Sequence, residues 1–254
     1  MRTANPALND SSFEKQLDAG YTGRTMTLEG TVNKTGILLM LIVATASFTW
    51  YQYVTHGPSA AYPWMIGGAI GGLIMALITC FSPTKAPYTA PIYALLEGLF
   101  LGGISVMAQT QLESRGITDV PIVLQAVCLT FGILLALLLV YRLGIIKATE
   151  NFKLGVAAAT GGIFMIYMVS IVMGFFGVNI PYIHEGGLIG IGFSLFVIVI
   201  ASLNLVLDFD FIENGAETGA PKYMEWYGAF GLVVTLVWLY IEILRLLMKI
   251  YDRR

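Results

Sequence analysis

Long apolar runs separated by short polar segments dominate this chain. Each run is about twenty residues long, which is the length that a helix needs to cross the hydrocarbon core of a bilayer. The alternation of apolar and polar positions that marks the strands of a membrane barrel is absent. The pattern predicts seven membrane-spanning helices, at residues 35–54, 63–81, 92–109, 122–141, 154–176, 187–207 and 224–248.

The polar segments between these runs predict the connections. Three prolines within residues 82–91 indicate a short loop, residues 142–153 a basic loop, and the Gly-rich residues 214–221 a polar turn. Glycines at small-xxx-small spacing allow two membrane helices to approach closely. In the second run these are Gly67, Gly68, Gly71 and Gly72.

The composition supports an all-α polytopic membrane protein, because 57% of the residues are hydrophobic and 12% are charged. A soluble domain of this length would carry about twice that share of charge. The net charge of −2 says little about partners, but the lack of a basic patch argues against a nucleic acid partner. Cys80 and Cys128 each stand alone within a predicted span, which indicates small packing residues rather than a disulfide or a metal cluster.

Residues 1–30 differ from the rest of the chain, because they are rich in polar residues and contain no long apolar run. They contain neither the apolar core nor the small-residue cleavage site of a signal peptide, so the first span would itself direct insertion. We predict a polar cytoplasmic segment at residues 1–30, followed by a seven-helix transmembrane domain at residues 31–254.

The distribution of lysine and arginine predicts an orientation in the membrane. With the N-terminus in the cytoplasm, the outer loops hold Arg115, and the positive-inside rule is satisfied. The C-terminal Lys249, Arg253 and Arg254 oppose this orientation, because seven crossings place them outside. The inner segments hold Arg2, Lys15, Arg24, Lys34, Lys85, Arg142, Lys147, Lys153 and Lys222.

The sixth run ends in an acidic stretch that includes Asp208 and Asp210. Carboxylates beside hydrocarbon are costly, so an ionisable group within a span suggests a functional site. On a helix, Asn204 and Asp208 share a face, while Asp210 points nearly the opposite way. We therefore expect Asp208 to face inward and Asp210 to lie at headgroup level. A solvated helix end is the alternative interpretation.

Further charges within the predicted spans are Glu97, Glu242 and Arg245. Glu242 and Arg245 are three residues apart and could neutralise each other. Glu97 lies beside glycines and could hydrogen-bond across a helix contact without any role in transport. Two buried carboxyl groups close together would share a proton, and once ionised they would supply oxygen ligands for Ca²⁺.

The chain lacks the sequence signatures of common catalytic and cofactor sites. It has no Ser/His/Asp set, no metalloprotease motif, no phosphate loop and no dinucleotide fingerprint. We therefore expect a protein that is not an enzyme and holds no cofactor.

Several short motifs, in order, resemble the Bax inhibitor-1 (TMBIM) family, specifically its prokaryotic YccA/YetJ-like branch. The resemblance covers nearly the whole chain beyond the N-terminal tail. The motifs are Asn5-Pro6-Ala7, Tyr93-Ala94-Leu95-Leu96-Glu97-Gly98 with Leu101-Gly102, Asp208 followed by Ile212, and Leu239-Tyr240-Ile241-Glu242 leading into Leu244-Arg245-Leu246-Leu247.

The resemblance implies a seven-helix fold with a central last helix, in the inner membrane of a bacterium. It also implies a pH-sensitive calcium leak, gated by one acid from the sixth helix and one from the seventh. Asp208 matches the sixth-helix acid by its spacing to Ile212 and would contact the Ca²⁺, and Asp210 is the alternative match.

The resemblance leaves the seventh-helix acid open. The Leu-Tyr-Ile-Glu motif nominates Glu242, although that residue lies roughly 24 Å along the helix from Trp226. Glu225 lies at a better depth but in a weaker motif. An ungapped match instead puts the apolar Val233 at the acid position.

Two other functions compete with the leak. Bacterial relatives of this type are associated with modulating a membrane-bound AAA protease, which implies a cytoplasmic contact through residues 1–30. A proton-coupled transporter that uses Glu97 as a relay is the third candidate. The bilayer is the expected partner in each case, and the sequence is compatible with a monomer.

Overall fold

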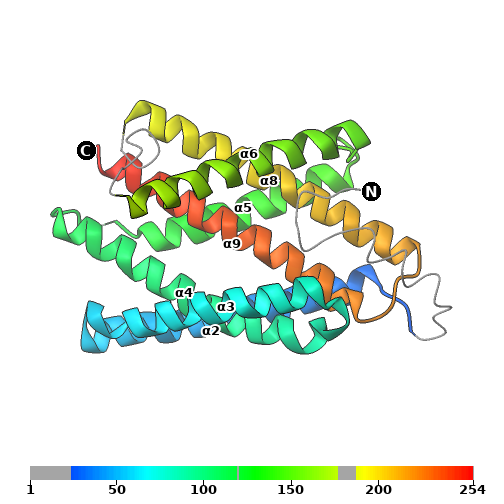
Figure 1. Ribbon diagram of the computed structural model, residues 1–254, viewed down its shortest axis with the longest axis horizontal. Helices are drawn as coiled ribbons and strands as arrows, with labels where there is room; N and C mark the ends of the chain where they lie inside the picture. The colour runs from blue at the N-terminus through cyan, green and yellow to red at the C-terminus, as the bar shows by residue number, and fades with distance from the viewer. Residues whose placement is uncertain (1–23, 119, 177–186, 254) are drawn as a thin grey trace.

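The computed structural model describes residues 24–118, 120–176 and 187–253 and contains seven long helices (Figure 1). All seven are long and apolar enough to cross a membrane. The prediction of an all-α, multi-pass membrane protein is therefore confirmed. The helices are α2 (Leu28–His56), α3 (Tyr62–Phe81), α4 (Ala86–Ser114), α5 (Ile122–Arg142), α6 (Glu150–Phe175), α8 (Leu188–Glu217) and α9 (Met224–Tyr251).

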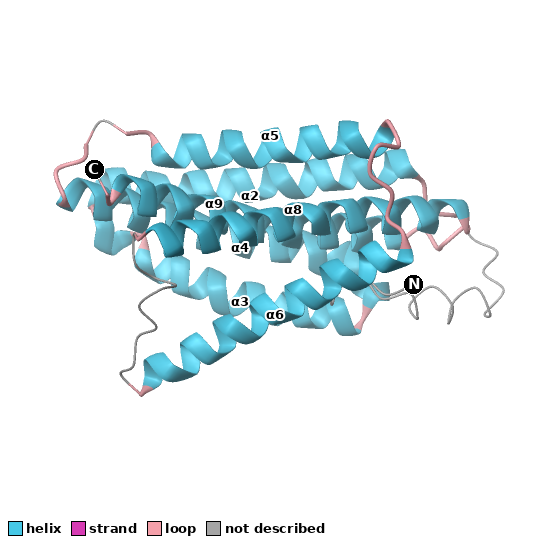
Figure 2. Ribbon diagram, turned by 90° about the horizontal axis from the view of Figure 1, so that it is seen from above, coloured by secondary structure: helices cyan, strands magenta, loops and turns pink. Residues whose placement is uncertain are grey.

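Helix α9 is the centre of the bundle, as the family resemblance implies. It runs diagonally through the middle of Figure 1 and packs against α2, α4, α5 and α8. In its most apolar 18-residue window, 67% of the residues are buried, against 11% for α6. Figure 2 shows α6 crossing the other helices obliquely, with one end away from them. The last helix therefore forms the core, and α6 lies at the periphery.

Glycines bring α2 and α3 into close contact with α4. A Cβ on Gly68 of α3 would lie 2.5 Å from the carbonyl oxygen of Leu96, and one on Gly102 of α4 would lie 2.7 Å from that of Ala46. A larger residue at either position would push the backbones apart. Small residues therefore set the helix spacing here, as expected where apolar burial alone does not drive helices together.

The prediction of a loop at residues 82–91 is wrong beyond Lys85. A short 3₁₀ turn, η2 (Pro83–Lys85), leads directly into α4, so Pro87 lies in the first turn and Pro91 inside the helix. Proline is tolerated in a first turn because the N–H that it lacks would have no intrahelical partner.

Helix α8 continues through the acidic stretch to Glu217, so the predicted turn at residues 214–221 begins four residues too early. The helix ends where Gly219 adopts a left-handed conformation, with φ of 71°. The N–H of Ala220 then donates to the carbonyl of Gly215, and that of Gly219 to Ala216. This is a Schellman motif, which glycine favours because it has no Cβ.

Helix α2 begins at Leu28, within the polar segment predicted for residues 1–30. The side chain of Thr27 caps it by accepting from the N–H of Gly30, at 3.0 Å. Residues 1–23 of that segment, including Asn5-Pro6-Ala7, lie outside the described residues.

Candidate functional site

Asp208 lies on α8 and is fully buried, with 0% of its surface exposed. Asn204, one turn earlier, is 2% exposed and donates from its amide to Thr160 Oγ1 of α6 at 2.8 Å. The two side chains share the buried side of α8, as their four-residue spacing predicts. Asp208 is therefore an inward-facing carboxyl group in the membrane domain.

The antiparallel packing of α8 and α9 fixes which residues lie opposite Asp208. Ile212 Cγ1 lies 3.1 Å from where a Cβ on Gly228 would be, and the rings of Phe211 and Tyr227 are 6.5 Å apart. Asp208 lies one turn before Ile212 on α8, so on α9 it lies level with residues about one turn after Gly228, at 231–233. The ungapped match that put Val233 at the acid position fits this register.

Glu225 lies near the start of α9 and is fully buried, with donors on both carboxylate oxygens. Oε1 accepts from the N–H of Thr27 at 2.9 Å, from its hydroxyl at 2.8 Å and from Lys222 Nζ at 2.6 Å. Oε2 pairs with Lys34. Gly30 of α2 packs against the carboxylate. Glu225 therefore joins the start of α2 to the start of α9.

Glu242 lies in the second half of α9 and is 1% exposed. Its Oε2 accepts from Tyr167 OH of α6 at 2.8 Å and from Arg245 Nη1 at 3.0 Å. Arg245 Nη1 also donates to Tyr167 OH, and the guanidinium carbon lies 5.2 Å from the tyrosine ring centroid. The other oxygen, Oε1, is buried and accepts no hydrogen bond among the described residues. The expected pairing of Glu242 with Arg245 is present.

Asp210 lies on another side of α8 from Asp208 and pairs with a lysine. Its Oδ2 is 2.8 Å from Lys153 Nζ, with 4% of the lysine side chain and 20% of the aspartate side chain exposed. The prediction that Lys153 belongs to a basic loop is wrong, because α6 begins at Glu150 after the Thr149 cap. Lys153 is thus a buried helical cation that neutralises Asp210.

Glu97 lies on α4 and faces α3, with 8% of its surface exposed. Its Oε2 is 2.9 Å from where a Cβ on Gly72 would be. The glycine leaves the space that the carboxyl group fills, which matches the interpretation of Glu97 as a residue beside a Gly-lined helix contact.

These acids lie at different depths in the bundle. Along α9, Glu225 is about 10 Å and Glu242 about 15 Å from the level of Asp208, at 1.5 Å per residue. Glu225 and Glu242 each have cationic partners of their own. The structure therefore does not bring Asp208 together with an acid of the seventh helix.

A resident metal would need several ligands in one place. No three His, Cys, Asp or Glu side chains meet to hold a metal ion within residues 24–118, 120–176 and 187–253. Calcium takes typically about six to eight oxygen ligands. Asp208 is therefore not part of a cluster of ligands among the described residues.

Sequence reasoning missed two buried lysines. Lys249, counted above as an outer terminal charge, is 5% exposed and donates to Gly190 O and Ser194 Oγ at 3.0 and 2.9 Å. Its seven-residue spacing from Glu242 places both on one helix face, which is the signal that could have identified it. For Lys153, the signal was the Thr149-Glu150 helix start.

The model of the family described as Bax inhibitor 1 like matches residues 5–252. No curated protein and no solved structure matches the chain. Because the match spans nearly the entire sequence, this protein belongs to the Bax inhibitor 1-like family.

Proposed function

We propose that this protein is a pH-sensitive cation leak of the Bax inhibitor-1 type, conducting calcium. We assign it to the prokaryotic YccA/YetJ-like branch, in a bacterial inner membrane with its N-terminus in the cytoplasm. The observation that carries the proposal is the complete burial of Asp208 in α8 beside the central helix α9. Burying a carboxyl group in a membrane domain is costly, so its presence there suggests a functional site.

The protonation state of Asp208 would set how closely α8 and α9 pack. A neutral carboxyl group carries no net charge into the buried contact between the two helices, where Asp208 is 0% exposed. An ionised one places a charge at an interior contact, where desolvation is expensive. Loss of the proton would therefore favour separation of the two helices and entry of water and cations, so flux should rise with pH.

The acids of the seventh helix have a different role in this proposal. Glu225 holds α9 to α2 through Lys34, and Glu242 holds α9 to α6 through Tyr167. They would contribute to gating by holding the two ends of α9, the Glu225 end more firmly than the Glu242 end, while Asp208 responds to the proton between them.

Calcium flux from liposomes across a series of pH values tests this mechanism. We expect Asp208→Asn to abolish the pH dependence, because the amide cannot ionise. The matched control is Glu217→Gln, an exposed acid at the end of the same helix, which should keep the wild-type response. Wild-type flux and pH response in Asp208→Asn would refute the mechanism.

Regulation of a membrane-bound AAA protease is the second candidate function, and one observation favours it. The segment before α2 is attached to the turn between α8 and α9. Met26 N donates to Ala220 O at 2.7 Å, and Lys222 N donates to Arg24 O at 3.0 Å. Residues 1–23 therefore precede a segment that contacts this turn, where a bound partner could act on both helices.

Deletion of residues 1–23 distinguishes the two functions. If the deletion removes an effect on proteolysis and leaves calcium flux intact, regulation is the function of the tail. If both proteolysis and flux are unchanged, the tail has neither role.

A further inference from the structure

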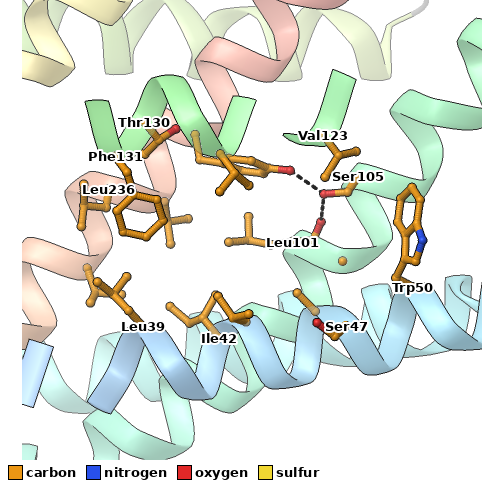
Figure 3. Close-up of a pocket in the computed structure, with 17 residues that line it drawn as sticks. Leu39, Ile42, Ser47, Trp50, Leu101, Ser105, Val123, Thr130, Phe131 and Leu236 are labelled. Atoms are coloured by element: carbon orange, nitrogen blue, oxygen red, sulfur yellow. Dashed lines mark hydrogen bonds between the residues drawn. The ribbon is translucent and has the colours of Figure 1, made fainter. Parts of the chain in front are cut away.

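An apolar cavity of about 280 Å³ lies between α2 and α5, with α4 and α9 behind it (Figure 3). The residues at the back are buried: Ile42 and Leu101 are 7% exposed and Val233 is 0% exposed. Those at the front are not, because Val43 of α2 is 54% and Phe131 of α5 is 37% exposed. The cavity therefore opens sideways, between α2 and α5.

The opening of this cavity faces the bilayer. The helices beside it expose large apolar side chains, including Met40 at 67% on α2 and Leu124 at 61% on α5. In a membrane-spanning bundle such surfaces contact lipid, so the cavity is continuous with the lipid-facing surface of the protein. The molecules with access to it are those dissolved in the hydrocarbon.

The length of the cavity matches one leaflet of a membrane. Along α2 its lining runs from Leu39 to Trp50, which is about 16 Å at 1.5 Å per residue. Half of the hydrocarbon core is about 15 Å. A helix of a second protein, roughly 10–12 Å wide with its side chains, does not fit a volume of this size. We propose that the cavity binds one acyl chain of a membrane phospholipid.

Three hydroxyl groups on the wall, those of Ser105, Thr130 and Tyr240, already have partners. Ser105 Oγ donates to Leu101 O at 2.7 Å, so Tyr240 OH donates to Ser105 Oγ at 2.6 Å. Figure 3 shows both bonds as dashed lines. Thr130 Oγ1 donates to Ala126 O at 2.8 Å. Buried water needs about two to four polar partners, and these three hydroxyl groups already bond within the protein, so hydrocarbon is the fitting occupant.

Trp50 indicates where the lipid headgroup lies. It occupies one end of the cavity in Figure 3, and its indole N–H makes no hydrogen bond within the described part of the chain. Tryptophan is favoured at the depth of the headgroups, where its ring is apolar and its N–H meets polar groups. The ester region of the phospholipid lies beside Trp50, in the leaflet opposite the turn between α8 and α9.

Photolabelling in vesicles tests this site. The protein is reconstituted in phosphatidylcholine that carries a diazirine in one acyl chain, and labelled residues are located by peptide mass spectrometry. We expect labels on the buried residues Ile42, Leu101 and Leu236. In Val127→Trp, the indole fills the cavity, and labelling of these residues should fall about fivefold or more.

The matched control is Leu124→Trp, on the same helix but facing the bilayer, which should label like wild type. If Val127→Trp does not give a folded protein, Ser47→Trp at the exposed rim replaces it. Labels confined to exposed residues such as Met40, or unchanged labelling of the buried residues in the filled variant, would overturn the proposal.

A second labelling arm uses a free fatty acid that carries the same diazirine. Labelling of the buried residues by phosphatidylcholine is expected whether or not the fatty acid also enters. If the fatty acid labels them and phosphatidylcholine does not, the assignment to a phospholipid is wrong. Neither arm measures ion flux, so its result is independent of the proposed leak.

Discussion

Two buried acids on α9 are neutralised in different ways. Glu225, near the start of the helix, is 0% exposed and has donors on both oxygens, from Thr27, Lys34 and Lys222. Glu242, near the other end, is 1% exposed and has donors on one oxygen, from Tyr167 and Arg245. Its second oxygen accepts no hydrogen bond in the described part of the chain.

The difference indicates which end of α9 is more firmly held. Lys34 and Glu225 are 191 residues apart, so their pair joins the first described helix to the last. Arg245 lies three residues from Glu242 on the same helix, so that pair holds no second element in place. The link outward is Tyr167, on the peripheral helix α6. In the proposed leak, α9 would therefore move about the Glu225 end.

The largest effect on stability should follow from Glu225→Gln. The change leaves Lys34, with 17% of its side chain exposed, without its carboxylate, whereas Lys222 at 42% can be solvated. Breaking a buried ion pair costs about 3 kcal/mol. For a chain of this size that corresponds to a fall in Tm of about 6–12 °C. Thermal unfolding in detergent measures it, with Glu29→Gln, an exposed acid on α2, as the control.

A double-mutant cycle shows whether the loss comes from this pair. The double variant Lys34→Met/Glu225→Gln should be more stable than the sum of the two single changes predicts, because both charges are removed together. Additive effects would mean that Lys34 and Glu225 are not coupled, and the comparison between the two ends of α9 would fail.

A smaller effect is expected for Glu242→Gln. The glutamine keeps an acceptor for Tyr167 and Arg245, and Arg245 is 36% exposed and can be solvated. The loss should be about 1.5 kcal/mol, the low end of the range for a hydrogen bond to a charged group. The same melting assay measures it, with Glu29→Gln again as the reference. A loss as large as that of Glu225→Gln would show that the two ends are held equally well.

The sequence predicted the architecture well because hydrophobic runs record which segments cross the membrane. All seven predicted spans correspond to helices, and the motifs around Glu97 and Asp208 indicated the family that the comparison then confirmed. Hydrophobic runs and short motifs each lie within one segment of the chain, so they can be recognised in a single sequence.

Ion-pair partners were harder to predict, because they depend on which helices meet. Lys34, Lys153 and Lys222 were counted as charges of inner segments, whereas each pairs with an acid of α8 or α9. The residue of α9 that lies opposite Asp208 was also hard to predict, because it depends on where the turn between α8 and α9 ends. Gly219 sets that point through its left-handed conformation, and one turn of helix in either direction changes which residue faces the acid.

The smallest effect should come from a third ion pair, which tests whether the burial of a charge or its number of charged partners matters more. Asp210 is 20% exposed, and its partner Lys153 also lies 3.5 Å from Glu150 Oε1. In Asp210→Asn the lysine keeps that second carboxylate, so the loss should be below about 1 kcal/mol, as for partly exposed pairs. Removing both acids, in Glu150→Gln/Asp210→Asn, leaves a 4% exposed lysine without a carboxylate and should cost clearly more in the same melting assay. If Asp210→Asn alone destabilises the protein as much as Glu225→Gln does, the burial of Lys153 matters more than its number of carboxylate partners. The two ends of α9 should then be ranked by how deeply the cations at each end are buried.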